Sequence, residues 1–503
     1  MNRPLRHIAV FCGILTLALL LRATWVQFAR NDELSNQKQN RRVQIEAFSH
    51  PRGDIIVGGK PITGSKDTSG TDFKYKRVFK DGPMYAPVTG YFSQAQGATF
   101  LEGVHNGILS GSDDRLFIRR TLDMLTGKKQ QGGDVVTTID PEAQKAAYRG
   151  LVNLDAKGAV VALDPRSGKV LALASTPSYD PSVFAGISQE EGRAFERLAD
   201  RKDKPLNNRA LRESYPPGST FKILTAAAAL EHGVVTDIDE PTGAETPYKL
   251  PLSSTRIGND VPDANCDKVS MKTGMQWSCN NVFLDLALKV GKDRMRETAE
   301  KFGFNDEHFL PVRAVASSYP EKLDKPQTAL TGMGQGSLTS TPLQMAMVTA
   351  GLANGGKVMK PYLVEELRGP DLSAVEKGEP HELDRAVSEK TARTVQEMME
   401  NTVENGTANK ARIDGVTVGG KTGTAQHGAN VNDERPYAWF VSYAKAPGND
   451  DGGDGGDGGD GESPVAVAVF VDPSNMNIAR SEIAGGKLGA PIAKAVMEAV
   501  LER

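Results

Sequence analysis

The sequence has few histidines and cysteines and no excess of charge of either sign. Only 7 His and 3 Cys occur among 503 residues, and none stands in an H-E-x-x-H pattern or in a Cys/His cluster with metal-ligand spacing. We therefore expect neither a metal nor a cofactor. The 60 basic and 63 acidic residues leave a formal net charge of −3. Because no basic field would hold a polyanion, nucleic acid is not an expected partner.

A long apolar run is lacking except near the N-terminus, at residues 8–21. This run is shorter than the roughly 20 residues that a membrane span needs, and its length would suit a cleaved signal peptide. No A-x-A cleavage pattern follows the run. If the apolar segment is extended to Phe28, it becomes long enough to span a membrane, provided that the Arg22 side chain snorkels to the outer surface. Basic residues precede the run and stay inside. We therefore expect a cytoplasmic tail at 1–7 and an uncleaved, single-pass anchor in the cell membrane at 8–29, with the remainder extracytoplasmic; a cleaved signal is the alternative.

The rest of the chain is too long for one compact core, so two or more units are expected. Residues 30–133 are polar and rich in Gly, Lys and Arg, which favours a mostly extended N-terminal pedestal module. Residues 134–503 alternate helical and strand patterns, which indicates an α+β domain with a mostly antiparallel sheet and helices on its faces. The expected helices cover 141–151, 221–231, 282–290, 343–352, 389–404 and 491–501; the expected strands cover 134–139, 159–163, 170–174, 416–426, 438–444 and 465–471.

An acidic glycine-rich tract occupies residues 449–461. It contains the G-G-x-G-x-D string of calcium-binding β-helix repeats. The period here is only three residues, and no apolar residue alternates to build a β-helix core. We therefore expect a solvated, disordered loop that joins two strands.

Ser219 and Lys222 form an S-x-x-K motif directly before an apolar helical run. At a helix start, unpaired amides and the helix dipole favour developing negative charge, and Lys222 lies one turn later on the same face. A serine hydroxyl needs a base to attack a carbonyl, and a lysine serves if burial and a second cation lower its pKa. Alone the motif is weak, since a helix N-cap Ser followed by a surface Lys gives the same letters.

A second motif, Ser278-Cys279-Asn280, precedes another apolar helical run. A hydroxyl here can relay a proton, and an amide can hold a substrate carbonyl or the base. A plain helix N-cap would give the same pattern, so this motif is also weak by itself.

A third motif, Lys421-Thr422-Gly423-Thr424, lies on the expected strand 416–426. An extended substrate can lie along such a strand if nothing projects at Gly423. Lys421 supplies a second positive charge, while Thr422 and Thr424 offer hydroxyls to a carboxylate.

The same segment also fits the P-loop pattern G-x-x-x-x-G-K-[ST] from Gly415 to Thr422. A P-loop needs an apolar strand before its first Gly and a helix that starts at its Lys. Residues 411–414 contain little apolar content, and the glycines after Lys421 would not start a helix. The context therefore disfavours a nucleotide site.

Together, the three motifs match in order and spacing the S-x-x-K, S-x-N and K-T-G set of penicillin-binding proteins and serine β-lactamases. Further segments at 51–56, 158–181, 334–336, 341–344 and 406–408 resemble class B penicillin-binding proteins, closest to the penicillin-binding protein A branch of monofunctional D,D-transpeptidases. The resemblance implies a transpeptidase fold with a five-stranded sheet between helices. It implies peptidoglycan stem peptides ending in D-Ala-D-Ala and lipid-linked nascent glycan as substrates, β-lactams as acylating antibiotics, and a membrane glycosyltransferase as partner.

The resemblance also implies a role for each motif residue. Ser219 would be the nucleophile, Lys222 its base, and Ser278 the relay that carries the proton to the leaving D-Ala. Asn280 would orient the substrate amide. Lys421, Thr422 and Thr424 would bind the terminal carboxylate, and the charge of Lys421 would keep Lys222 from holding its proton. The backbone amides of Ser219 and Thr424 would form the oxyanion hole.

Two other functions share some of these features. A serine β-lactamase would carry the same motifs, and Ser219-Thr220-Phe221-Lys222 resembles the class D version, but class D has Val where Asn280 stands. No class A-type E-x-x-L-N follows Ser278, and a hydrolase does not need the module before residue 133. A non-catalytic penicillin-binding sensor or scaffold would need a cytoplasmic output domain, and about seven residues precede the anchor.

Two of the three cysteines, Cys266 and Cys279, lie in the expected extracytoplasmic part, where disulfides persist. A bridge would close a loop of about 14 residues and stabilise the fold by about 3 kcal/mol in the chain-entropy account. Two free thiols are the alternative, because sequence does not show that the two Cα atoms come within roughly 7 Å.

Overall fold

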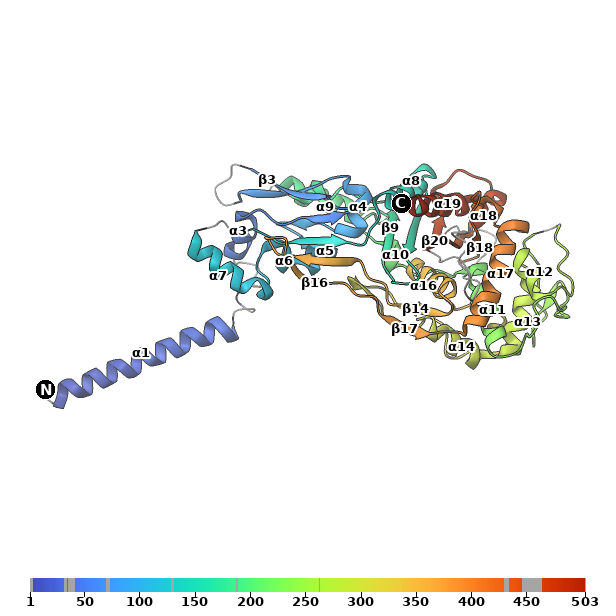
Figure 1. The fold of residues 1–503 in the computed structure, drawn as a ribbon, viewed down its shortest axis with the longest axis horizontal. Coiled ribbons are helices and arrows are strands. Elements are labelled where there is room, and N and C mark those ends of the chain that lie inside the picture. The colour runs from blue at the N-terminus through green and yellow to red at the C-terminus, as the bar shows by residue number, and fades with distance from the viewer. Residues whose placement is uncertain are drawn as a thin grey trace, which may run out of the picture.

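The computed structural model describes residues 3–30, 34, 41–68, 73–127, 131–186, 189–261, 263–428, 434–445 and 464–502. The molecule is elongated: helix α1 projects from one end, an N-terminal module follows, and the C-terminal domain forms the opposite end (Figure 1). The acidic tract at 449–461 lies outside the described residues, so its expected conformation stays a prediction.

Helix α1 (Arg3–Ala29) is the candidate membrane span. It has 27 residues and a mean hydropathy of 2.0 in its most apolar window, and no part of that window is buried in the protein. At 1.5 Å per residue such a helix is about 40 Å long, enough to cross a hydrocarbon core of about 30 Å. The expected single N-terminal apolar helix is therefore confirmed.

The C-terminal domain is built on a five-stranded sheet with the order β18-β19-β20-β8-β9. Every neighbouring pair is antiparallel, as expected from the sequence. The strands are β8 (Lys157–Leu163), β9 (Val170–Thr176), β18 (Val418–Ala425), β19 (Tyr437–Ala444) and β20 (Val465–Asp472). Strand β18 lies at one edge, which leaves one side of its backbone free of a neighbouring strand in this sheet.

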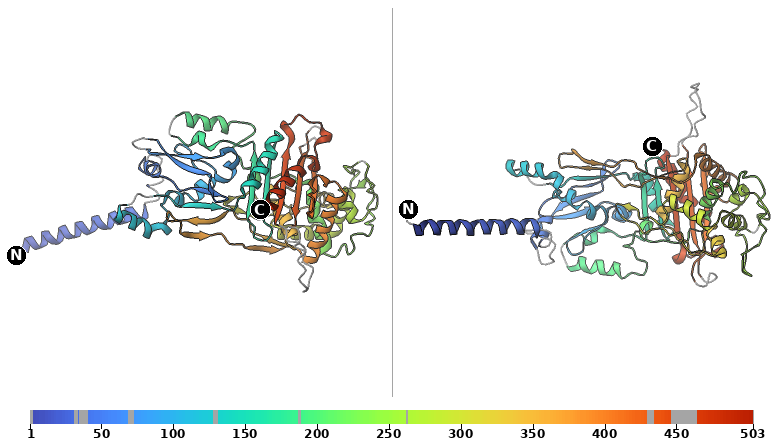
Figure 2. Two further views of the ribbon diagram at one scale, coloured as in Figure 1. Left: turned by 45° about the horizontal axis from the view of Figure 1, so that its top comes forward. Right: turned by 90° about the horizontal axis from the view of Figure 1, so that it is seen from below.

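Helices cover both faces of this sheet (Figure 2). Alternate residues of β8 point to opposite faces: Val160 and Ala162 pack in the cluster that includes α8 (Pro141–Asn153) and α19 (Ala490–Leu501). Ala159 and Val161 pack in the other cluster. That second cluster includes residues of α11 (Lys222–Glu231), α16 (Pro342–Ala353) and α17 (Glu389–Asn405), and α16 is buried along almost its whole length. All of these helices were expected from the sequence, with ends that differ by a few residues.

The N-terminal module combines short strands with short helices. Its strands are β1 (Ile55–Val57), β2 (Lys60–Pro61), β3 (Thr63–Asp67), β4 (Tyr75–Phe79), β5 (Phe92–Ser93) and β6 (Gly97–Ala98). Its helices are α3 (Arg41–Ser49), α4 (Gly82–Thr89), α5 (Phe100–Val104), α6 (Asn106–Ser110) and α7 (Phe117–Thr126). The module is therefore less extended than expected. Helices of five to nine residues, which all of these except α7 are, are too short to show a clear 3.6-residue pattern.

A second sheet joins the module to a later part of the chain. Its order is β16-β15-β7-β1-β2. Strand β7 (Asp134–Thr137) is parallel to β1 and antiparallel to β15 (Val364–Arg368), which in turn pairs with β16 (Ala374–Lys377). The domain boundary expected at residue 133 therefore falls inside this sheet, because β7 lies between strands from the two parts.

The remaining α-helices and strands lie around or between these parts. They are α9 (Gln189–Ala199), α10 (Arg209–Arg212), α12 (Met271–Gln276), α13 (Asn280–Val290), α14 (Lys292–Lys301), α15 (Lys325–Thr331), α18 (Gly485–Leu488), β10 (Tyr248–Lys249), β11 (Arg256–Ile257), β12 (Phe309–Leu310), β13 (Val312–Arg313), β14 (Lys357–Met359) and β17 (Glu382–Arg385). Helix α9 contacts the N-terminal module through the rings of Phe195 and Tyr91.

Candidate active site

Ser219 lies in a tight turn at the start of a buried helix. The 3₁₀ turn Gly218–Phe221 runs directly into α11. Gly218 has φ +54°, and a Cβ there would lie 2.8 Å from the carbonyl oxygen of Thr424, so only glycine fits this position. The Gly218 amide donates to the carbonyl of Gly334 at 2.9 Å. The turn is thus fixed against β18, and Ser219 is 5% exposed.

Ser278 occupies a strained position just after helix α12. Its φ is +60°, the left-handed region where glycine is usual at a helix end. The Cys279 amide donates to the Gly274 carbonyl at 2.8 Å, and the Ser278 amide donates to the Met275 carbonyl at 3.3 Å. The left-handed conformation costs an L-residue roughly 1–2 kcal/mol. The side chain that causes this cost also carries the hydroxyl that meets both lysines of the site.

Two buried lysines converge on the Ser278 hydroxyl. Lys222 Nζ donates to the Ser278 carbonyl at 2.7 Å, to Asn280 Oδ1 at 2.7 Å and to Ser278 Oγ at 3.2 Å. Lys421 Nζ donates to Ser278 Oγ at 2.8 Å and to the Thr422 carbonyl at 3.0 Å. Both lysines have 0% exposure. Ser278 therefore links the two cations.

Burial lowers the pKa of both lysines, because desolvation disfavours the charged ammonium. The pKa of Lys222 falls to about 7, although the carboxylate of Asp260 opposes the shift. The pKa of Lys421 is also well below its usual value, first through burial and then through repulsion by Lys222. In the structure, burial is thus the cause of the lowered pKa of Lys222. From the sequence, we expected the positive charge of Lys421 to lower this pKa as well. A lysine poised near neutrality can act as a base.

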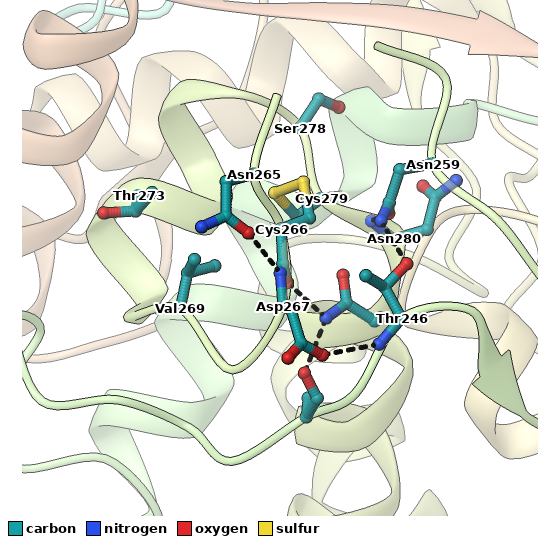
Figure 3. The surroundings of a disulfide bond; sticks show 12 residues. Thr246, Asn259, Asn265, Cys266, Asp267, Val269, Thr273, Ser278, Cys279 and Asn280 are labelled. Atoms are coloured by element: carbon teal, nitrogen blue, oxygen red, sulfur yellow. Dashed lines mark hydrogen bonds between the residues drawn. A yellow bond between two sulfur atoms is a disulfide. The ribbon is translucent and has the colours of Figure 1, made fainter. Parts of the chain in front are cut away.

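Asn280 is held at both ends of its side-chain amide. Its Oδ1 accepts from Lys222, and its Nδ2 donates to the Gly258 carbonyl at 2.9 Å. Its backbone amide donates to Asn259 Oδ1 at 2.6 Å. Asn259 Nδ2 in turn donates to Thr246 Oγ1 at 2.8 Å (Figure 3). In this structure Asn280 therefore orients Lys222 and joins it to a loop at 256–260.

A disulfide joins Cys266 and Cys279, with a Cα–Cα distance of 5.7 Å (Figure 3). Of the two alternatives left open by the sequence, the structure thus forms the bridge. It attaches the 265–267 loop to the middle residue of the S-x-N motif. Asn281 Nδ2 donates to the Cys266 carbonyl at 2.7 Å and to the Ala244 carbonyl at 2.8 Å. The backbone on both sides of the motif is therefore fixed by covalent and hydrogen bonds.

The K-T-G motif lies in the middle of β18. A Cβ at Gly423 would lie 2.9 Å from Thr220 Cγ2 and 3.0 Å from Trp439 Cβ. The absence of a side chain at Gly423 thus makes room for the Gly218–Phe221 turn. Gly423 therefore has a packing role in addition to the clearance for substrate expected from the sequence. The Thr422 hydroxyl pairs with that of Thr407 at 3.0 Å. Because Lys421 begins no helix, the P-loop interpretation is wrong.

A cavity of about 310 Å³ opens over these groups. Its lining includes Ser219, Asn280 and Thr424 together with the 256–260 loop, and also Met333, Gln335 and Gln426. A larger cavity of about 570 Å³ lies elsewhere, lined by parts of 86–104 and 175–212, and contains none of the motif residues. Among the described residues, no group of three or more His, Cys, Asp or Glu side chains is placed to hold a metal. The cavity that Ser219 lines lies beside Ser278 and the two buried lysines that meet its hydroxyl.

Comparisons with known proteins agree with this site. The penicillin binding protein transpeptidase domain matches residues 158–451, and the penicillin binding protein A dimerisation domain matches residues 52–135. The chain belongs to the penicillin-binding protein transpeptidase family. The resemblance seen in the sequence is thus confirmed.

Several relatives of this penicillin-binding protein cover its whole length. It is 38% identical to "Peptidoglycan D,D-transpeptidase PbpA" of Mycolicibacterium smegmatis and 39% identical to the protein of that name from Mycobacterium tuberculosis, each over 100% of this chain and 99% of the relative. It superposes on the ceftriaxone acyl-enzyme complex of penicillin-binding protein A from M. tuberculosis with a TM-score of 0.83 and 38% identity, covering 91% of this chain and 100% of that one. The penicillin G acyl-enzyme complex of that protein gives a TM-score of 0.81 at 38% identity, over 90% and 100%.

The structure of this penicillin-binding protein brings the three motifs together as one site. Sequence reasoning missed the 256–260 loop, whose Gly258 and Asn259 hold Asn280 and whose Asp260 acts on both lysines. No motif marks this loop, since its only local signal is the Gly-Asn pair of a turn.

Proposed function

We propose that this protein is a membrane-anchored peptidoglycan D,D-transpeptidase that forms an acyl-enzyme at Ser219. The observation that carries the proposal is the convergence of Lys222 and Lys421, both fully buried, on Ser278 beside the cavity that Ser219 lines. The names and acyl-enzyme complexes of full-length relatives support it.

The first half-reaction forms the acyl-enzyme. Neutral Lys222 accepts the proton of the Ser219 hydroxyl, and the oxygen attacks the carbonyl carbon between the two D-Ala residues of a stem peptide. The amide C–N bond then breaks. Lys222 passes this proton to the Ser278 hydroxyl along their contact of 3.2 Å, while that hydroxyl gives its own hydrogen to the leaving amine. The terminal D-Ala leaves with its amine complete.

The second half-reaction transfers the acyl group to the amine of another stem peptide. That amine attacks the ester carbonyl and gives up a proton through the same groups, and Ser219 regains its hydrogen. Thr424 lines the cavity beside Ser219, which supports the proposal that their amides bind the oxyanion and that Thr422, Thr424 and Lys421 bind the terminal carboxylate. A β-lactam acylates Ser219 in the same way, but its leaving amine stays attached.

We also propose the cellular setting. Arg3 and Arg6, in the first turns of α1 before its apolar run, would keep the N-terminus in the cytoplasm, so that the catalytic domain lies outside. The substrate would be lipid-linked nascent glycan, delivered by a membrane glycosyltransferase that works beside this protein. The N-terminal anchor and the module at 52–135 support this arrangement.

The test is a transpeptidation assay with the full chain in nanodiscs. A donor peptide ending in D-Ala-D-Ala and an acceptor amine should yield one cross-linked product for each D-Ala released, as measured by mass spectrometry. Ser219→Ala should abolish both products, whereas Ser254→Ala, a change at an exposed serine, should not. Release of D-Ala without cross-linked product, or rapid turnover of a penicillin, would indicate a hydrolase and contradict the proposal.

A further inference from the structure

Helix α7 is attached to the protein body by its charged side. Arg119 on α7 forms an ion pair with Asp371, and Arg115 in the preceding turn forms one with Glu376. Both carboxylates belong to the hairpin of β15 and β16. Arg115 Nε also donates to Asp113 Oδ1 at 2.8 Å. Arg119, on the polar side of α7, thus faces the protein.

The apolar side of α7 faces outward. Phe117 is 60% exposed, Leu122 55% and Leu125 79%. Positions five and eight residues after Phe117 fall within one broad face of an α-helix. In an ordinary surface helix the apolar face packs on the core and the charged face meets water. In α7 the arrangement is reversed, so something apolar outside the described residues should cover this face.

The position of α7 indicates what covers it. In all three views α7 lies at the end of the molecule that faces α1 (Figures 1 and 2). Residues 30–40 separate the end of α1 from the start of α3, and they reach at most about 40 Å. The end that bears α7 is therefore tethered close to the surface of any membrane that α1 spans.

The sequence of α7 suits a lipid surface. Three of its ten residues, Arg119, Arg120 and Asp123, carry a charge, so the helix is too polar to span a membrane. A helix that combines an apolar face with charged residues instead lies in the interface between lipid and water.

We propose that α7 lies in the headgroup region of the membrane, with Phe117, Leu122 and Leu125 in contact with lipid. This inference rests on the proposal that α1 anchors the protein. Together, α1 and α7 would hold the N-terminal module at two points, which restricts its tilt. The catalytic domain, at the far end of the molecule (Figure 1), would then be held at a defined height above the bilayer.

The test measures lipid contact directly, with the full chain in vesicles of phosphatidylcholine and phosphatidylglycerol. Cys12→Ser removes the free thiol of α1, and the disulfide protects the other two cysteines. A fluorophore is attached at Leu125→Cys, at Leu20→Cys within α1, or at Leu252→Cys, which is 90% exposed in the catalytic domain. Lipids that carry a nitroxide near the headgroup end of the acyl chain quench the fluorophore where it contacts lipid. This shallow position is chosen because an interfacial helix penetrates only about 5–10 Å into the bilayer.

Quenching at residue 125 should exceed that at residue 252 severalfold. Quenching at residue 20 shows that the anchor is inserted. If residue 20 is quenched while residue 125 is quenched no more than residue 252, the membrane role of α7 is wrong although the anchor stands. A blue-shifted emission at residue 125 that persists in detergent and lacks lipid quenching would instead show that a second copy covers this face, and would equally overturn the proposal.

A negative charge placed on the apolar face of α7 should weaken its contact with lipid. Leu125→Glu should reduce the lipid quenching of a probe at Leu122→Cys severalfold, whereas Leu252→Glu should leave it unchanged. Penicillin acylation of the detergent-solubilised Leu125→Glu variant should equal that of the unmodified protein, which shows that the variant is folded. Unchanged quenching in a folded Leu125→Glu variant would also contradict the proposal.

Discussion

Ser278 combines backbone strain with the hydroxyl that we propose as the proton relay, and two substitutions separate these effects. Ser278→Ala and Ser278→Gly both remove the hydroxyl that accepts from Lys421 at 2.8 Å and from Lys222 at 3.2 Å. They therefore lose the same hydrogen bonds. Only alanine keeps the Cβ that is strained at φ +60°.

The difference in stability between the two variants follows from this geometry. The left-handed conformation costs alanine roughly 1–2 kcal/mol, while glycine loses about 0.4–1 kcal/mol through the greater freedom of its unfolded chain. Ser278→Gly should thus be the more stable variant by about 1 kcal/mol. In a domain of this size the melting temperature should differ by about 2 °C.

Both variants should lose acylation to a similar degree. Proton transfer by a positioned group contributes about 10²–10⁴-fold, so the rate of labelling by a fluorescent penicillin should fall by that order in each. Thermal melting and stopped-flow labelling of the same preparations measure the two effects. If Ser278→Gly melts below Ser278→Ala, the strain argument is refuted. If either variant labels at the original rate, the hydroxyl has no part in proton transfer.

Three further predictions concern the surroundings of the nucleophile. The second-order rate constant of acylation should rise with pH and reach half its maximum near pH 7, the pKa of Lys222 being about 7, because only neutral lysine accepts a proton. A rate constant that does not change between pH 6 and 8 would show that Lys222 is not the base. Asn259→Ala removes the oxygen that accepts from the Asn280 backbone amide at 2.6 Å, and it should slow acylation severalfold, since a hydrogen bond contributes about 1 kcal/mol. Asn259→Asp keeps an acceptor oxygen and should slow acylation less. Equal rates in the two variants would refute the positioning role of Asn259. Thiol blocking of the denatured full chain should modify Cys12 alone before reduction. Reduction of the Cys266–Cys279 bridge should slow acylation and lower the stability of the catalytic domain by up to about 3 kcal/mol. Three blockable thiols without reductant would show that the bridge is absent.

The sequence predicted the central sheet, the helices on its faces and the three motifs because these features are local. Strand β20 is an apolar run up to Asp472, helix α16 is mostly apolar, and each of the three motifs spans only three or four residues. The order of the motifs then identified the family before their distances were known.

The features that the sequence did not predict join distant segments. Asn259 meets Asn280 across 21 residues, and β7 pairs with β15, with Thr137 opposite Val364. Such contacts depend on tertiary packing and leave no periodic signal. The reversed orientation of α7 is likewise set by the ion pairs of Arg115 and Arg119 with the β15–β16 hairpin, which an amphipathic pattern alone does not reveal.

The central claim is that Ser219 is the acylated nucleophile, and mass spectrometry after penicillin labelling tests it most directly. The full chain in detergent should gain the mass of one penicillin, and the modified peptide should carry it on Ser219, which lines the cavity within a turn of Lys222. The adduct should persist for many minutes, and Ser219→Ala should abolish it while Ser254→Ala retains it. An adduct on another residue, or labelling that survives Ser219→Ala, would contradict the account.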